Sequence, residues 1–290
     1  MRQAVSTKDV TAVAGAVLAA YLDAYPDGDP MFVPRIFSWA VDCFTGQLAD
    51  YQPIDARYHD FEHTMQGTLC LARLLHGRHR AGVEPVLTRR NFELTILAIL
   101  LHDTGYLKKR DDRAGTGAKY TIIHVRRSAD FAAEFLAKQR FDAAEIAAVQ
   151  NMILCTGFNA ALAQIPFGTA AEKIGGLALA TADLLGQMAA DDYVDKLPIL
   201  YAEFAEATRY MPEAKHPAAL FTSAEELQRK TPGFWESYVR PKLDQDFAGI
   251  HHFLSDPYPA GPNSYLDAID ANIARLKREL AAAPVAAVAG

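Results

Sequence analysis

Apolar residues recur at spacings of three and four along most of this 290-residue chain, and that period predicts helices. No alternating run of apolar and polar residues stands between turn residues, so no strand is predicted. The pattern therefore predicts an all-α fold. The helical segments that it marks most clearly are Ala118 to Gln139, Asp142 to Thr156, Thr169 to Ala190, Asp192 to Tyr210 and Asn263 to Leu280.

Capping residues predict where three helices begin. Thr7 can cap a helix from Val10 to Tyr25, and Thr88 can cap the apolar helix that ends at His102. Thr231 is followed by Pro232, which is the usual order of a cap and the first helical position.

Gly- and Pro-containing stretches separate these helices. Gly157 to Gly168, Met211 to Thr222 and Ser255 to Asn263 are predicted to be long loops. The last of these is Pro-rich, and it either joins two helices or lies over a cleft; connections are the commoner use of such segments. The uncharged stretch Ala281 to Gly290 is expected to fray.

Composition indicates a globular protein with a large core, because 50% of the residues are hydrophobic and 22% are charged. We expect N-terminal helices in residues 1–50, a catalytic core in 51–255 and a C-terminal helix and tail in 256–290, packed as one unit. The net charge of −6 gives no footprint for a nucleic-acid polymer. No membrane span or secretory signal is recognisable. Three separated cysteines indicate reduced thiols and a cytoplasmic location.

Three histidines and two aspartates carry the strongest functional signal. His59 and His63 lie four residues apart, which on a helix places both on one face. His102 and Asp103 end an apolar helix, and Asp183 stands alone in an apolar segment, where a carboxylate is costly without a partner. A single histidine is more often a packing residue than a ligand, but the set predicts a site for a divalent ion such as zinc, iron, manganese or magnesium.

The same residues resemble the signature of the HD-domain metal-dependent phosphohydrolases, which is a His, a His-Asp doublet and a distant Asp. The segment Tyr58 to His63 is similar to the Tyr-His-Asn-x-x-His motif of class I cyclic nucleotide phosphodiesterases, with Asp60 in place of Asn. The resemblance implies an HD-domain helical bundle with its metal centre in the core cleft. It covers about Tyr51 to Leu254 and includes Met152 to Thr156, Ala182 to Leu184 and Thr231 to Pro241.

The resemblance also assigns roles to these residues. It implies that His63, His102, Asp103 and Asp183 hold one metal ion and that Asp103 bridges to a second. His59 would then be the general acid, because an imidazole beside the metal can protonate a leaving alkoxide. Orientation of a ligand is the structural alternative for His59.

His124 is a further candidate, about 20 residues after the doublet. Many HD-domain proteins have a histidine near this position that ligates a second metal. An ordinary surface histidine beside two arginines is the alternative. No histidine occurs between Val149 and Thr156, which argues against the mixed-valence iron oxygenases of the same fold and favours hydrolysis.

Two departures from the phosphodiesterase pattern concern the substrate. Thr231 stands where the purine-reading Gln is expected, so that mode of purine recognition would be lost. Phe234 is kept and could stack on a flat group or simply pack in the core. The basic run Lys108, Lys109 and Arg110 replaces the expected sequence after the doublet and is either a phosphate contact or a solvated loop.

These features together predict a metal-dependent phosphohydrolase with two divalent ions, in which a metal-bridging hydroxide attacks a phosphodiester of a small nucleotide. Candidate substrate-binding residues are Tyr58, Thr231 and Phe234. A phosphomonoesterase that uses the same site is the alternative enzyme. A non-catalytic HD scaffold that senses a ligand or binds a partner is the alternative of a different class.

Overall fold

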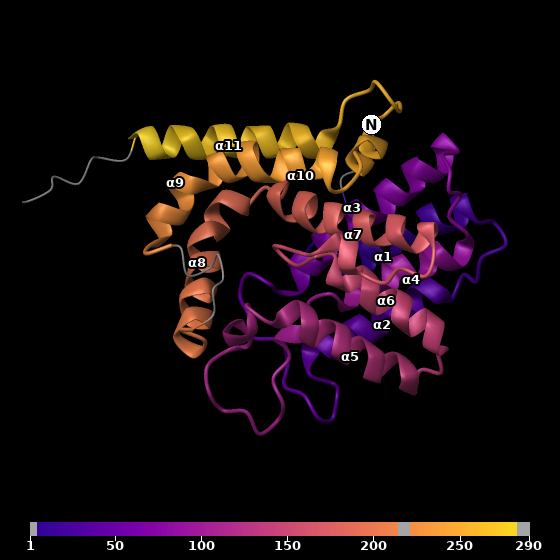
Figure 1. The fold of residues 1–290 in the computed structure, drawn as a ribbon, viewed down its shortest axis with the longest axis horizontal. Coiled ribbons are helices and arrows are strands. Elements are labelled where there is room, and N and C mark those ends of the chain that lie inside the picture. The colour runs from indigo at the N-terminus through magenta and orange to yellow at the C-terminus, as the bar shows by residue number, and fades with distance from the viewer. Residues whose placement is uncertain (1–4, 214–220, 283–290) are drawn as a thin grey trace, which may run out of the picture.

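The computed structural model describes residues 5–213 and 221–282, and within these ranges the chain is helical with no strand (Figure 1). The predicted all-α class is confirmed. Part of the predicted loop Met211 to Thr222 and most of the predicted frayed tail Ala281 to Gly290 lie outside the described residues; Ala281 and Ala282 are helical.

Long helices alternate with short 3-10 turns and one π-helical turn. No helix in the described ranges is both long enough and apolar enough to cross a membrane. The α-helices are α1 (Val10–Ala24), α2 (Phe32–Thr45), α3 (Phe61–Ala81), α4 (Arg89–Leu101), α5 (His124–Lys138), α6 (Ala143–Leu154), α7 (Ala170–Met188), α8 (Tyr193–Tyr210), α9 (Ala224–Phe234), α10 (Arg240–Gln245) and α11 (Ser264–Ala282). The shorter turns are η1 (Thr104–Tyr106), η2 (Gly117–Tyr120), η3 (Leu162–Gln164), the π-helical η5 (Trp235–Val239) and η6 (Ile250–Leu254).

Helices α3, α4, α6 and α7 form the centre of the molecule. Every residue of α4 from Phe92 to Leu101 is buried, as expected of a helix that is apolar nearly all round and surrounded by others. Helices α3 and α7 make the most extensive contact in the fold, and both also contact α4. The central bundle therefore brings the start of α3, the end of α4 and the middle of α7 together.

Glycine allows α3 and α7 to approach closely. A Cβ atom on Gly186 of α7 would lie 2.8 Å from the backbone of both Gln66 and Gly67 of α3. Real Cβ atoms do not approach backbone so closely, so any larger residue must push the two helices apart. Gly186 follows Asp183 by three residues and Gln66 follows His63 by three, so this contact fixes the spacing of two predicted ligands.

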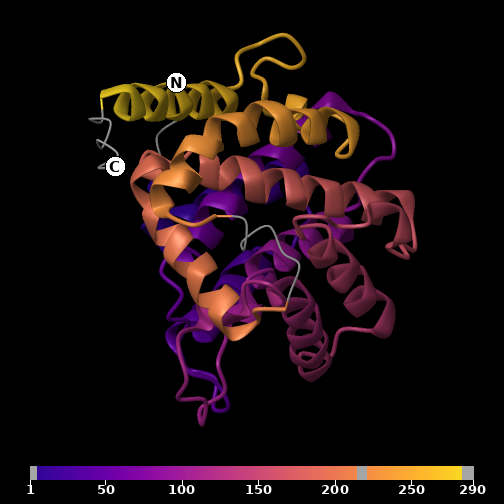
Figure 2. The ribbon, with the colours of Figure 1, turned by 60° about the vertical axis from the view of Figure 1, so that its left-hand side comes forward.

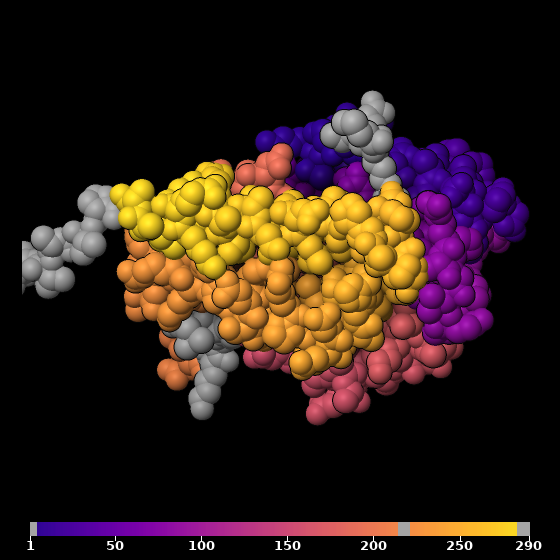
Figure 3. All heavy atoms as spheres, turned by 90° about the horizontal axis from the view of Figure 1, so that it is seen from above, coloured from indigo at the N-terminus to yellow at the C-terminus, as the bar shows by residue number. Residues whose placement is uncertain are grey.

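The remaining helices cover this bundle. Helix α1 packs on α3, α2 packs on α1 and α4, and α5 packs on α6. The segment from α9 to η6 and the long helix α11 run beside each other over one face, as the views in Figures 2 and 3 show. Val13 of α1, Ile36 of α2 and Ile269 of α11 belong to the same hydrophobic core as the central helices.

Two of the predicted caps concern the helices α4 and α1. Thr88 caps α4 as predicted, in a reciprocal capping box with Asn91. The prediction for Thr7 is wrong, because α1 is capped by Asp9, whose Oδ1 accepts the N–H groups of Thr11 and Ala12 at 2.9 and 3.1 Å. A carboxylate accepts such bonds more strongly than a hydroxyl and lies directly before the first turn.

The predicted helix start at Thr231 is also wrong. Helix α9 begins at Ala224, where the Ser223 side chain accepts the N–H of Glu226. Thr231 and Pro232 lie inside the helix, and the Thr231 hydroxyl donates to the Leu227 carbonyl at 2.8 Å. The π-helical turn η5 follows directly, and such a turn changes the hydrogen-bond register of the helix after the proline.

The helix expected from Ala118 begins only at His124, because residues 117–120 form the separate turn η2. The segments Asp142 to Thr156, Thr169 to Ala190, Asp192 to Tyr210 and Asn263 to Leu280 agree with α6, α7, α8 and α11 to within two residues. Gly157 to Gly168 is a loop that contains η3, and Ser255 to Asn263 joins η6 to α11.

We predict that Gly186→Ala destabilises the protein by roughly 1–3 kcal/mol, because the new methyl group overpacks the α3–α7 contact. The control is Gly15→Ala in α1, where a Cβ would meet nothing within 4 Å. That variant should be stabilised by up to about 1 kcal/mol through helix propensity. Chemical denaturation measures both changes, and an equal gain for the two variants would contradict a tight contact at Gly186.

Candidate metal centre

Three helices deliver four of the predicted ligands to one point. His63 lies in the first turn of α3, whose cap Asp60 accepts the His63 N–H at 2.8 Å. His102 caps the C-terminal end of α4 and Asp103 follows it at the start of η1. Asp183 comes from the middle of α7. The ends of α3 and α4 and one face of α7 therefore converge here.

The four side chains alternate nitrogen and oxygen around a ring. Nε2 of His63 lies 3.3 Å from Oδ2 of Asp103 and 3.2 Å from Oδ1 of Asp183. Nε2 of His102 lies 3.3 Å from each of the same two oxygens. An ion about 2.0–2.2 Å from such donors would separate neighbouring ligands by about 3.0–3.5 Å. The observed spacing fits that requirement.

The hydrogen bonds of these side chains also leave the atoms that face one another available to a metal ion. Nδ1 of His102 lies 2.7 Å from the Ile99 carbonyl, so it carries the proton and Nε2 has a free lone pair. Nε2 of His102, Oδ2 of Asp103 and Oδ1 of Asp183 are buried without a hydrogen-bond partner in the described part of the chain. Buried polar atoms without partners are costly, and a metal ion would satisfy all three. The group His63, His102 and Asp103 can therefore hold a metal ion.

The negative charges of Asp103 and Asp183 also favour a bound cation. The Asp103 side chain is 1% exposed and that of Asp183 is 14% exposed. Burial opposes protonation of His63, but the close contact and the negative charge of the two carboxylates raise its pKa to about 10. Burial also opposes ionisation of Asp183, and the charges of His102 and His63 outweigh it and lower the pKa of that carboxyl. The site therefore demands a cation, which is a proton on His63 unless a metal ion is bound.

His59 reaches the centre in a different way from that predicted. It precedes Asp60, the cap of α3, and so it does not share a helix face with His63. Their rings are nevertheless 5.3 Å apart. Nδ1 of His59 lies 2.6 Å from Oε2 of Glu203, and Oε1 of Glu203 accepts the Tyr58 N–H at 2.7 Å. The position of His59 is set by α8, not by the period of α3.

Glu203 was missed by the sequence reasoning. It lies in α8 with its side chain 5% exposed. Burial opposes its ionisation, but the charge and hydrogen bond of His59 and the N–H groups of Tyr58 and Arg57 hold its pKa below the usual range. An acidic residue on the buried side of α8, between Leu197 and Ala207, was the available signal.

Tyr106 was also missed, and it connects His59 to His124. Its buried ring stacks on His59 at 4.6 Å between centroids and on His124 at 4.7 Å, with interplanar angles of 15° and 24°. The rings of His59 and His124 are themselves 5.8 Å apart, so the three rings form a triangular cluster beside the candidate metal centre. The sequence offered no signal for this, because Tyr106 follows the His-Asp doublet where the resemblance expects other residues.

His124 faces the second oxygen of Asp103. Its Nε2 lies 3.7 Å from Oδ1 of Asp103, and its Nδ1 lies 2.6 Å from the Thr121 carbonyl. Burial lowers the pKa of His124 to about 4, so the ring is neutral near pH 7 with Nε2 unprotonated. The alternative of an ordinary surface histidine does not describe this position.

The candidate substrate residues lie around the centre and not within it. Tyr58 is buried and its hydroxyl donates to Oε1 of Gln187 at 2.9 Å. Thr231 is buried with its hydroxyl bonded inside α9. Phe234 stacks on Tyr238 at 5.1 Å, and Tyr238 stacks on Phe158 at 4.8 Å.

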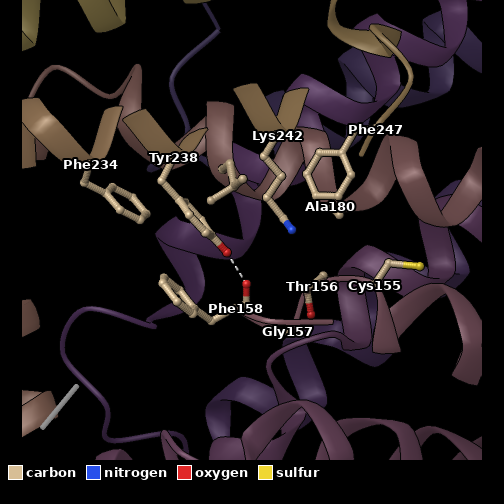
Figure 4. A pocket seen from close by; sticks show the side chains of 10 residues that line it. Cys155, Thr156, Gly157, Phe158, Ala180, Phe234, Tyr238, Lys242 and Phe247 are labelled. Carbon is tan, nitrogen blue, oxygen red and sulfur yellow. Dashed lines mark hydrogen bonds between the residues drawn. The ribbon is translucent and has the colours of Figure 1, made fainter. Parts of the chain in front are cut away.

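These aromatic rings line a pocket between the loop after α6 and the helices α7 and α10 (Figure 4). Ala180 and Leu184 of α7 form one wall, and Leu184 directly follows Asp183. The Lys242 amine points into the space, and the Tyr238 hydroxyl donates to the Phe158 carbonyl. The pocket thus borders the helix that carries one of the metal-site carboxylates.

The basic run after the doublet is bonded within the chain. Lys108 is buried and pairs with Asp55 at 2.8 Å. Lys109 donates to the Tyr51 hydroxyl, and Arg110 donates to backbone carbonyls, including that of Gly46. These bonds tie the segment to residues 46–55, so neither a free phosphate contact nor a wholly solvated loop describes it.

We predict that His102→Ala loses the metal that the wild-type protein retains after dialysis, because one of the converging nitrogens is removed. The matched control is His76→Ala, which breaks another close His–Asp pair, the 2.6 Å contact with Asp23 outside this centre. Elemental analysis of the dialysed proteins gives the metal content. Wild-type content in the His102 variant would contradict this ligand assignment.

Glu203→Gln should lower stability by roughly 1–3 kcal/mol at pH 7, because it removes the charge that faces His59. The folded pKa of Glu203 lies below the unfolded value of about 4.3, so its stabilisation is present above that pH and is lost as the pH falls through the folded pKa. The difference in melting temperature from wild type should therefore shrink in acid. Glu134→Gln on the exposed side of α5 should show no such trend.

Sequence comparison with known proteins identifies the family of this chain. No curated protein matches it. A model of the Npun_R2479-like family matches residues 10–253, which run from the start of α1 into η6 and include every residue of the centre described above. Because this match covers well over half of the 290 residues, the chain belongs to the Npun_R2479-like family.

Proposed function

We propose that this protein is a metal-dependent phosphohydrolase of the HD-domain type that cleaves a phosphodiester of a small nucleotide. The alternating ring of His63, Asp103, His102 and Asp183 carries the proposal, since its facing atoms lie close together and three of the four are buried with no hydrogen-bond partner among the described residues. Imidazole and carboxylate ligands suit magnesium, manganese, zinc or iron. A proton-donating candidate, His59, stands beside this ring.

Asp103 supports a site with two ions. Its Oδ2 faces His63 and His102, whereas its Oδ1 faces Nε2 of His124 at 3.7 Å. A carboxylate with histidine nitrogens near each of its two oxygens is suited to bridge two ions. When bound, such ions supply an acidified water as nucleophile and neutralise the phosphate oxygens.

His59 is suited to protonate the leaving oxygen. Glu203 accepts the proton of Nδ1, so Nε2 is the ring nitrogen left to exchange a proton with a substrate. Stacking on Tyr106 holds the plane of the ring. A residue so fixed can transfer a proton without first losing rotational freedom.

A cluster of aromatic rings lies near the proposed centre, around a cavity of about 30 Å³ that is too small to enclose a nucleobase. Phe234 and Tyr238 stack on each other beside the segment of α7 that carries Asp183. Lys242 also lines this cavity and pairs with Asp246 at 3.0 Å. The Thr231 hydroxyl is committed to the Leu227 carbonyl and offers no hydrogen bonds to a purine edge. Thr231 therefore does not select one particular base.

The proposal predicts that the manganese-loaded protein hydrolyses bis-p-nitrophenyl phosphate faster than p-nitrophenyl phosphate. His59→Ala should keep the wild-type metal content and lose roughly 10²- to 10⁴-fold in rate, because general acid catalysis contributes about that much. Metal content and initial rates are measured on the same samples.

Other outcomes separate the alternatives. Faster hydrolysis of the monoester would replace the proposal with a phosphomonoesterase. A fully metal-loaded protein that cleaves neither ester would favour a non-catalytic scaffold. Loss of metal from the His59 variant would show that His59 is a ligand and not the acid.

A further inference from the structure

A second group of potential metal ligands lies near the C-terminal end of α3, whereas the candidate metal centre lies near its N-terminal end. Asp244 belongs to α10, and His251 and His252 belong to the turn η6. This turn rests on α3 at Gly77, where a Cβ would meet the Phe253 carbonyl oxygen. Gly77 lies about 21 Å along the helix axis from His63, since each residue advances an α-helix by about 1.5 Å. The two groups are therefore distinct.

The three side chains converge. Nε2 of His251 lies 3.7 Å from Oδ1 of Asp244, and Nε2 of His252 lies 3.8 Å from the same oxygen. The two imidazole rings are 4.1 Å apart between centroids. Gly249, with φ of 66°, starts the tight turn that holds both histidines against α10. These separations are too long for hydrogen bonds, but they exceed the spacing of ligands around a common ion by only a few tenths of an ångström.

His251 supplies an independent sign of a missing partner. The residue is 5% exposed, and its Nδ1 is buried with no hydrogen-bond partner in the described ranges. Its Nε2 lies 3.7 Å from Oδ1 of Asp244. Buried polar side chains are nearly always hydrogen-bonded, but this ring is not fixed by a bond at Nδ1, and Nε2 faces Asp244 from beyond hydrogen-bond distance, where an ion could lie between them. Burial lowers the pKa of His251 to about 4, which leaves the ring neutral near pH 7.

Nearby cations have other partners. Arg240 pairs with Asp270 at 2.8 Å, and Lys242 pairs with Asp246 at 3.0 Å. Neither basic side chain neutralises Asp244. The Asp244 carboxylate thus faces two imidazoles and remains free to bind a metal ion with them.

We propose that Asp244, His251 and His252 form a peripheral site for a borderline divalent ion such as zinc. Two imidazoles and one carboxylate are a ligand set that zinc accepts, with a fourth position left for water. The side chains of His252 and Asp244 are 58% and 61% exposed, so an ion can enter from solvent. Both side chains can also move the few tenths of an ångström that would bring their ligand atoms to metal-binding distance. The bound ion would join α10 to η6 and hold that turn against α3.

Zinc binding to protein whose first centre is already filled tests the site. Calorimetric titration with zinc chloride should find one more equivalent bound by wild type than by Asp244→Ala or His252→Ala. Removal of a ligand should weaken this step at least about tenfold, since loss of even a residue that only orients a ligand weakens metal binding that much. Both substituted residues are largely exposed, so the variants should fold, which their melting curves check.

Two variants control for nonspecific effects. Asp246→Ala removes a neighbouring carboxylate, and His79→Ala removes an exposed imidazole in the last turn of α3 that is not one of the proposed ligands. Both should bind zinc as wild type does. Zinc should also raise the melting temperature of wild type and of these controls, but not of the Asp244 or His252 variant. Equal zinc stoichiometry and equal thermal shifts in all five proteins would overturn the proposal, whatever the outcome of the ester assays.

Discussion

Two carboxylates, those of Asp103 and Asp183, lie between three helices with imidazole nitrogens as their nearest polar neighbours. Burial of such charges is tolerated only when a cation neutralises them. The requirement links the end of α4 to the middle of α7 and the start of α3. The central bundle is thus organised around an electrostatic need as well as around apolar packing.

Small residues in α7 allow the close helix packing that brings these side chains together. Helix α7 places Gly175 against Thr95 and Met152, Gly176 against Cys155, and Gly186 against the backbone of α3. Each glycine lets a neighbouring helix approach α7 more closely than a side chain would allow. The distances within the metal-binding group follow from this close packing, because the ligands are short side chains on helices that cannot separate.

The sequence predicted the helical class and the converging residues because both depend on local patterns. The apolar run before His102 and the isolated Asp183 are visible without any tertiary information. Contacts over long sequence separations were not visible. Glu203 contacts His59 across more than 140 residues of sequence, and the ring of Tyr106 stacks on both His59 and His124. The Thr231–Pro232 pair misled the prediction, because a local capping signal cannot reveal a helix that continues into a π-helical turn.

His59 stands outside α3, and its partner Glu203 belongs to α8, whereas the metal-binding group is built from α3, α4 and α7. The proposed proton donor is thus positioned by α8, whereas the candidate metal ligands are positioned by α3, α4 and α7. Evolution can alter one without disturbing the other. Substitution at His59 and Glu203 would therefore leave the close contacts among His63, His102, Asp103 and Asp183 in place.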